Sequence, residues 1–126
     1  MDQQGVTGIG AVAVPVTDQD KAVAFYVGVL GMEKRLDVPL ERFGGRWITV
    51  APPGSGTEVA LVPESAAQPA GREVGVRFST GDAAALHAAM KARGVEVDEL
   101  LEWEGTPPMF AFRDQDGNGH EIVQYG

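Results

Sequence analysis

The chain has 126 residues, enough for one domain with its own hydrophobic core. It contains no cysteine, which excludes disulfides, thiolate metal ligands and a cysteine nucleophile, and is compatible with a reducing cytosol. Its formal charge of −8, from 18 acidic and 10 basic residues, argues against a nucleic-acid partner and favours a cationic ligand if acidic residues line a cleft.

The start of the chain, MDQQGVTGIG, lacks the basic and apolar regions of a secretory signal. No apolar run reaches the roughly 18 residues that a membrane span requires. We therefore expect a cytoplasmic protein without a membrane partner.

The first half of the sequence has the pattern of a strand, a helix and three further strands. Residues 11–16 alternate valine with smaller residues, as a strand does. Residues 18–30 place apolar side chains at helical spacing, with Thr17 and Asp20 resembling a capping box and Gly31 a typical helix stop. Short strands are predicted in MEKRLDV, GRWITVA and TEVALV, separated by the breakers GG and PPGSG.

After a polar connector, residues 65–71, the same order begins again. EVGVRFS alternates as a strand, residues 81–93 form a second predicted helix, and strands follow in VEVDELLEW, PMFAFRD and HEIVQY, with DGNG as the turn of the final hairpin. With an offset of 63 residues the halves align through these pairs: Gly31 and Gly94, Trp47 and Phe110, Gly54 and Gly117, Gly56 and Gly119, Glu58 and Glu121. The sequence thus predicts a single α+β domain of two βαβββ modules, residues 5–64 and 72–126.

A four-stranded sheet buries one face under its helix and leaves the other to line a cleft. We expect the helix side to carry Val12, Val14, Val16, Val74 and Val76. Alternation then places on the cleft side Ala11, Ala13, Pro15, Glu58, Ala60, Glu73, Gly75, Arg77, Glu121 and Val123. Trp47 and Phe110 are candidates for aromatic walls, although both also suit an ordinary core. The candidate ligand-binding set is Trp47, Thr49, Glu58, Glu73, Arg77, Phe110, Phe112 and Glu121.

Two stretches, VAVPVTDQDKAVAFYVGVLGM and FRDQDGNGHEIVQ, resemble the vicinal oxygen chelate superfamily, which includes glyoxalase I, bleomycin-resistance proteins and extradiol dioxygenases. The resemblance covers nearly the whole chain and implies curved mixed sheets around a cleft. In the family's metalloenzymes, one residue of each first strand, often histidine, and one glutamate of each last strand hold a metal ion. The corresponding positions in this chain are Ala11, Glu73, Glu58 and Glu121, or Ala60 in place of Glu58 if its loop is shifted by two residues.

These positions depart from the family pattern, because Ala11 has no ligand atom and Glu73 replaces the usual histidine. The remaining carboxylates, Glu58, Glu73 and Glu121, suit a hard divalent cation such as Mg²⁺. Alternatively, Arg77 on the same predicted face compensates their charge without a metal, and we favour this second interpretation.

The two histidines do not add to the predicted ligand set. His87 lies in the middle of a predicted helix, and His120 alternates with Glu121 and so faces the opposite side of its strand. Both are expected to be surface or packing residues.

Three functions remain open from the sequence. The first is a binding protein without a cofactor, like the bleomycin-resistance branch, which sequesters a cationic molecule in clefts formed across a homodimer. The second is a divalent-metal-dependent lyase, isomerase or dioxygenase of the glyoxalase type, and the third is a metal-free enzyme in which Glu121 or Glu73 acts as a general base. The acidic charge and the alanine at position 11 favour the small-molecule binding protein, with Glu121 the candidate catalytic residue if a reaction occurs. A homodimer is expected because two open, curved sheets leave edges and a half-open cleft that a second copy would cover.

Overall fold

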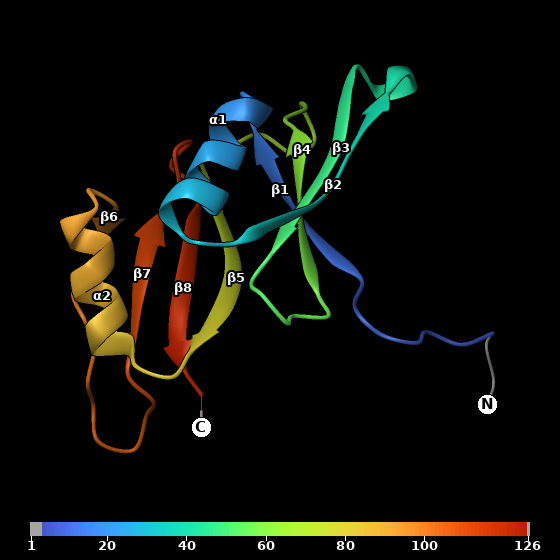
Figure 1. The fold of residues 1–126 in the computed structure, drawn as a ribbon. Helices are drawn as coiled ribbons and strands as arrows, with labels where there is room; N and C mark the ends of the chain where they lie inside the picture. The colour runs from blue at the N-terminus through green and yellow to red at the C-terminus, as the bar shows by residue number, and fades with distance from the viewer. Residues whose placement is uncertain (1–3, 126) are drawn as a thin grey trace.

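The computed structural model describes residues 4–125, which form two four-stranded mixed sheets with a helical segment in each half (Figure 1). The first module comprises β1 (Ala11–Val16), α1 (Gln19–Val23), the π-helical segment η1 (Ala24–Val29), β2 (Glu33–Leu40), the short 3-10 helix η2 (Glu41–Phe43), β3 (Gly45–Ala51) and β4 (Glu58–Pro63). The second comprises β5 (Glu73–Thr80), α2 (Ala83–Ala92), β6 (Glu96–Val97), β7 (Met109–Arg113) and β8 (Gly119–Gln124).

The two sheets repeat the same topology. Their strand orders are β1-β4-β3-β2 and β5-β8-β7-β6. In each, the first strand of the module pairs in parallel with the last, and the other neighbours are antiparallel. The predicted α+β fold of two βαβββ modules is therefore confirmed. No helix of the described residues is long and apolar enough to cross a membrane.

Both helical segments begin at a capping aspartate. The side chains of Asp18 and Asp82 each accept a hydrogen bond from the backbone N–H three residues further on, at 3.1 and 3.0 Å. The predicted capping box of Thr17 and Asp20 is thus wrong by one residue. Thr17 instead donates from its hydroxyl and its backbone N–H to the Asp116 carboxylate of the second module.

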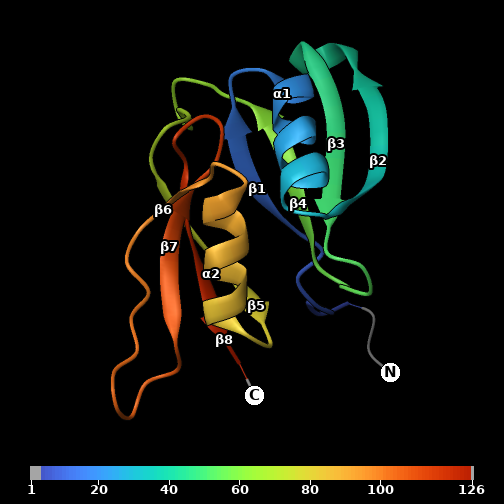
Figure 2. The same cartoon turned by 60° about the vertical axis from the view of Figure 1, so that its left-hand side comes forward.

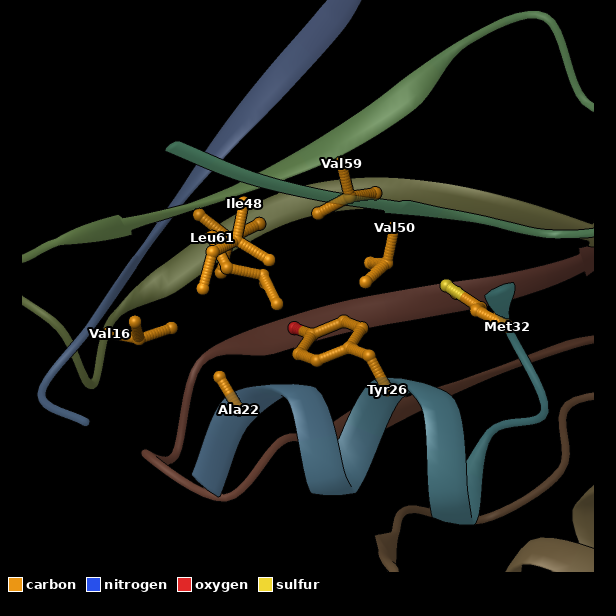
Figure 3. Close-up of a cluster of buried hydrophobic side chains, with 9 residues drawn as sticks. Val16, Ala22, Tyr26, Met32, Ile48, Val50, Val59 and Leu61 are labelled. Atoms are coloured by element: carbon orange, nitrogen blue, oxygen red, sulfur yellow. The ribbon is translucent and has the colours of Figure 1, made fainter. Parts of the chain in front are cut away.

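The main hydrophobic core lies between the first sheet and the segment α1–η1. Figure 3 shows the ring of Tyr26 beneath side chains of β3 and β4, among them Ile48, Val50 and Leu61. The valines expected on the helix side, Val12, Val14, Val16, Val74 and Val76, all belong to this cluster or pack against it. Residues of η1 also pack against the second core, under α2, so that α1–η1 lies between the two modules.

Phe110 and Phe112 belong to the second hydrophobic core. Each is 1% exposed, and both lie in the cluster that contains Met90 of α2. Phe110 also lines the small pocket beside Glu121 and Phe112 lines one beside Met90, so their part in a ligand site stays a prediction. In the two sheets Thr49 of β3 corresponds to Ala111 of β7. The offset that relates them is one residue shorter than the offset of 63 residues that pairs Trp47 with Phe110 in the sequence. A shift of one residue moves a side chain to the other face of a strand.

Buried polar groups also join the modules. Tyr26 donates its hydroxyl proton to Asp114 Oδ2 at 2.6 Å, and its oxygen lies 2.9 Å from His120 Nε2. The same carboxylate accepts hydrogen bonds from the Asn118 side chain and from two backbone N–H groups of the final hairpin turn. Asn118 in turn donates to the backbone carbonyl of Pro15 in β1. The turn predicted from DGNG thus also anchors the second module to the first.

Candidate functional site

A groove of about 730 Å³ lies between the modules. Its walls come from the edge strands β1 and β5, from the β3–β4 connection and from the chain just before β1. The lining is mainly apolar, with Ile9, Val12 and Val74 among its residues, and includes the polar side chains of Ser55 and Arg77. A largely apolar cleft with a few polar groups is typical of a small-molecule site.

A register shift in β5 determines which of its residues pairs with Glu121 of β8. Glu73 pairs with Gly119 and Arg77 pairs with Glu121, so four steps along β5 correspond to two along β8. Gly75 lies inside this bulge with a φ of +82°, a conformation that other residues adopt only with strain. The bulge therefore brings Arg77 to the position directly beside Glu121.

Glu121 and Arg77 form an ion pair on the face of the second sheet that lies opposite α2. The Arg77 Nε and Glu121 Oε1 atoms are 2.8 Å apart, and the two side chains are 59% and 34% exposed. This face, called here the open face of the second sheet, carries Arg77, Ser79, Met109, Ala111, Glu121 and Val123. An ion pair as exposed as this contributes only about 0–1 kcal/mol to stability, so it remains accessible to a ligand at little cost to the fold.

The two other candidate carboxylates have arginine partners of their own. Glu73 Oε1 lies 2.6 Å from Arg113 Nη1, a hydrogen bond that raises the pKa of Arg113. Glu58 Oε2 lies 3.7 Å from Arg35 Nη1. The Arg35 guanidinium is also held by the backbone carbonyls of the β3–β4 connection, at 2.7 and 3.2 Å.

These carboxylates do not form the metal site that the family resemblance implied. Among residues 4–125 no three His, Cys, Asp or Glu side chains are grouped so that they could hold a metal ion. Glu58 lies on the first sheet and Glu121 on the second. When the modules are aligned on their capping aspartates, Ala60 and not Glu58 corresponds to Glu121, as in the alternative alignment considered above. The donor set therefore does not fit the metal centre of the metalloenzymes.

Trp47 and Thr49 lie on the face of the first sheet opposite α1, because Ile48 between them is a core residue. Trp47 is half-buried. Thr49 is fully buried, and its Oγ1 has no hydrogen-bond partner among the described residues. The structure thus places Arg77 and Glu121 together on one sheet and Trp47, Thr49 and Glu58 on the other.

A second, smaller pocket of about 290 Å³ lies on the open face of the second sheet beside Glu121. Residues that the sequence did not single out line it: Asp98, Glu99, Leu101, Met109 and Ala111. They were missed because only Glu96 and Val97 of the predicted strand VEVDELLEW form β6. Leu101 returns to the sheet in an isolated bridge to Met109. The acidic residues of DELLE, residues 98–102, were the available signal, because the doublets in this segment break the alternation of a strand.

Both histidines are packing residues. His120 is 1% exposed and contacts the rings of Tyr26, Phe78 and Phe112. His87 packs edge-on against Phe110, with ring centroids 4.9 Å apart, and its Nε2 lies 2.8 Å from the backbone oxygen of Asp98. Neither ring lies on an open face of a sheet.

Sequence comparison agrees with the fold and with the two-module arrangement. Residues 8–122 match the Glyoxalase/Bleomycin resistance protein/Dioxygenase superfamily, and the chain belongs to this family. It is 32% identical over 114 residues to the uncharacterized protein YetH of Bacillus subtilis (strain 168), a match that covers 87% of this chain and 92% of YetH.

Solved structures of similar proteins share the whole fold. TnmS3, described as an antibiotic binding protein from Streptomyces sp. CB03234, is 34% identical with a TM-score of 0.86, over 96% of this chain and 98% of TnmS3. A member of the same superfamily from Sphaerobacter thermophilus DSM 20745 is 30% identical with a TM-score of 0.88, over 95% of this chain and 98% of that protein.

Proposed function

We propose that this protein binds a small, positively charged molecule on the open face of the second sheet, beside the groove between the modules, and carries out no metal-dependent reaction. The observation that carries this proposal is the exposed Arg77–Glu121 pair at the edge of an acidic, partly apolar pocket. A cationic group of a ligand can interact with Glu121 while the apolar lining holds the remainder. The likeness to an antibiotic-binding protein over nearly the full length supports the same class of function.

The arginines that lie beside the three candidate carboxylates support the proposal that the site contains no transition metal. Glu58, Glu73 and Glu121 each lie beside a different arginine of their own sheet, although Arg35, the partner of Glu58, is also paired with Glu33 at 3.0 Å. A lyase, isomerase or dioxygenase that chelates its substrate through a metal ion needs ligands that converge on one point. Arg77, which has no lone pair to donate to a metal ion, stands directly beside Glu121.

We also infer that the protein acts as a homodimer. The open face of the first sheet exposes Leu36 and Val38, which are 47% and 44% exposed, next to the half-buried Trp47. A second copy would cover this apolar strip and close the open clefts, in an interface of about 1,600 Å² in total. Light scattering at micromolar concentration should give twice the monomer mass, and a monomer mass there would contradict the inference.

Calorimetric titration with bleomycin, a cationic antibiotic, tests the proposed function. The wild-type protein should bind it, and Glu121→Gln should weaken binding about 30-fold, because removing one partner of a partly desolvated charge pair costs about 2 kcal/mol. Glu41→Gln, which neutralises an exposed carboxylate of the first module, is the matched control and should bind as the wild type does. Absence of binding by the wild type, or equal affinity of the Glu121→Gln variant, would contradict the proposal.

A further inference from the structure

An apolar pocket that takes no part in the proposed cation site lies where the two modules meet. Its volume is about 140 Å³, and segments of both modules line it: the turn of residues 30–32, the β3–β4 connection, β5, α2, β7 and β8. Figure 2 shows the segment α1–η1, which leads into this turn, and α2 on the same side of the two sheets. The pocket is therefore on the helix side, whereas Glu121 lies on the open face.

The pocket marks the place where two separately packed cores meet. Met32 belongs to the main core, whereas Met90 and Phe112 belong to the second core. Leu30 and Phe78 pack against both cores. Protein interiors contain few voids of this size, because the groups around a void lose contacts that close packing would give them. A molecule that fills the pocket would therefore supply contacts to both cores.

The lining of the pocket favours a neutral, apolar molecule. Of the described residues that line it, none is charged, and only Ser79 has a polar side chain. An ion would lose its hydration there without gaining a charged partner, which is costly. Pro52, Phe78 and Ser79 also line the groove between the modules, so the two hollows adjoin, but Arg77 belongs to the groove alone.

The size of the pocket limits what it can hold. Its inner end is formed by the buried side chains of Met90, Phe112 and Ile122, and its opening by the exposed residues Gly31 and Pro53. An apolar cavity of about 150 Å³ stays free of water and binds benzene. The two methionines of the lining can adapt to the shape of such a guest, and thioether sulfurs make favourable contacts with aromatic rings.

We propose that this pocket binds a neutral monocyclic aromatic molecule, about the size of benzene, between the two modules. The inference goes beyond the proposed function, because it assigns a second site on the other side of the sheets with an uncharged ligand. The bound molecule contacts both cores of the folded protein and has no such site in the unfolded chain. Its binding therefore raises the stability of the protein.

Methyl NMR with benzene as the probe tests this assignment. In protein labelled with ¹³C at the methionine methyl groups, benzene should shift the signals of Met32 and Met90, which line this pocket but not the groove between the modules. The signal of Met109, on the open face of the second sheet, is the internal control and should stay in place. Unshifted signals of Met32 and Met90, or an equal shift of Met109, would overturn the proposal.

Variants locate the site further. Leu86→Phe places a larger side chain in the pocket and should abolish the benzene shifts, whereas Leu36→Phe, on the exposed face of the first sheet, is the matched control and should bind as the wild type does. Glu121→Gln should also leave benzene binding unchanged, which separates this site from the proposed cation site. Equal binding by the Leu86→Phe and wild-type proteins would contradict the assignment. If Leu86→Phe does not fold, thermal unfolding of the wild type decides: benzene should raise its melting temperature, and no rise would refute the proposal.

Discussion

Replacing Tyr26 with phenylalanine should cost the protein a large part of its stability. The ring is fully buried, and its hydroxyl is the only atom removed. That hydroxyl donates to Asp114 and lies against His120 Nε2, so its loss removes one hydrogen bond to a carboxylate and leaves the imidazole N–H without its acceptor. The two losses together amount to about 3 kcal/mol of unfolding free energy. For a domain with about 5–15 kcal/mol in total, this is a substantial fraction.

Urea unfolding followed by circular dichroism measures this loss. Tyr125→Phe is the matched control, because Tyr125 is the other tyrosine of the chain and is 55% exposed. It should change the unfolding free energy by less than about 0.5 kcal/mol, as surface substitutions usually do. If Tyr26→Phe were no more destabilising than Tyr125→Phe, the buried cluster would not be the connection between modules that its geometry indicates.

Three further predictions concern the buried histidine His120 and two glycines of the second sheet, Gly75 and Gly119. Burial lowers the pKa of His120, although the nearby Asp114 carboxylate opposes this shift. The unfolded chain therefore takes up a proton at a higher pH than the folded protein does, so stability should fall as the pH drops below about 6.5. In urea unfolding, a His120→Gln variant should lack that decline. Gly75→Ala should cost about 1–2 kcal/mol because of the positive φ, and should weaken bleomycin binding by displacing Arg77; an unchanged affinity in calorimetry would show that the bulge does not position the site. At Gly119 an added Cβ would collide with the Glu73 carboxylate and the Arg113 guanidinium, so Gly119→Ala should separate this exposed pair at a cost below about 1 kcal/mol, and a crystal structure with the pair intact would refute that expectation.

The faces of the strands could be predicted from the sequence wherever alternation is strict. The valines of β1 and β5 fixed the buried side, and the same argument placed Glu121 opposite the helices, where the structure has it. Phe112 and Phe110 were assigned to the wrong face, because the offset was taken from glycines in turns of different length. One residue of error in a strand reverses every side chain.

Other features depend on contacts that no local pattern contains. Thr17 and Asp18 are both good helix caps, and the choice between them is decided by the hydrogen bonds of Thr17 with Asp116 in the other module. Likewise, the acidic pocket arises where β6 ends early and Leu101 rejoins the sheet. Its lining could therefore not be read from hydrophobic periodicity alone.

Elemental analysis tests most directly the central claim that arginines, and not a metal ion, neutralise the carboxylates of this site. The protein should be purified without chelators and without added metal, and its metal content measured by mass spectrometry beside that of the Glu121→Gln variant. We predict well under one equivalent of any transition metal in both, since Glu58, Glu73 and Glu121 are separately paired with arginines. One equivalent of zinc, nickel or iron that is lost in the Glu121→Gln variant would contradict the account and favour a metalloenzyme.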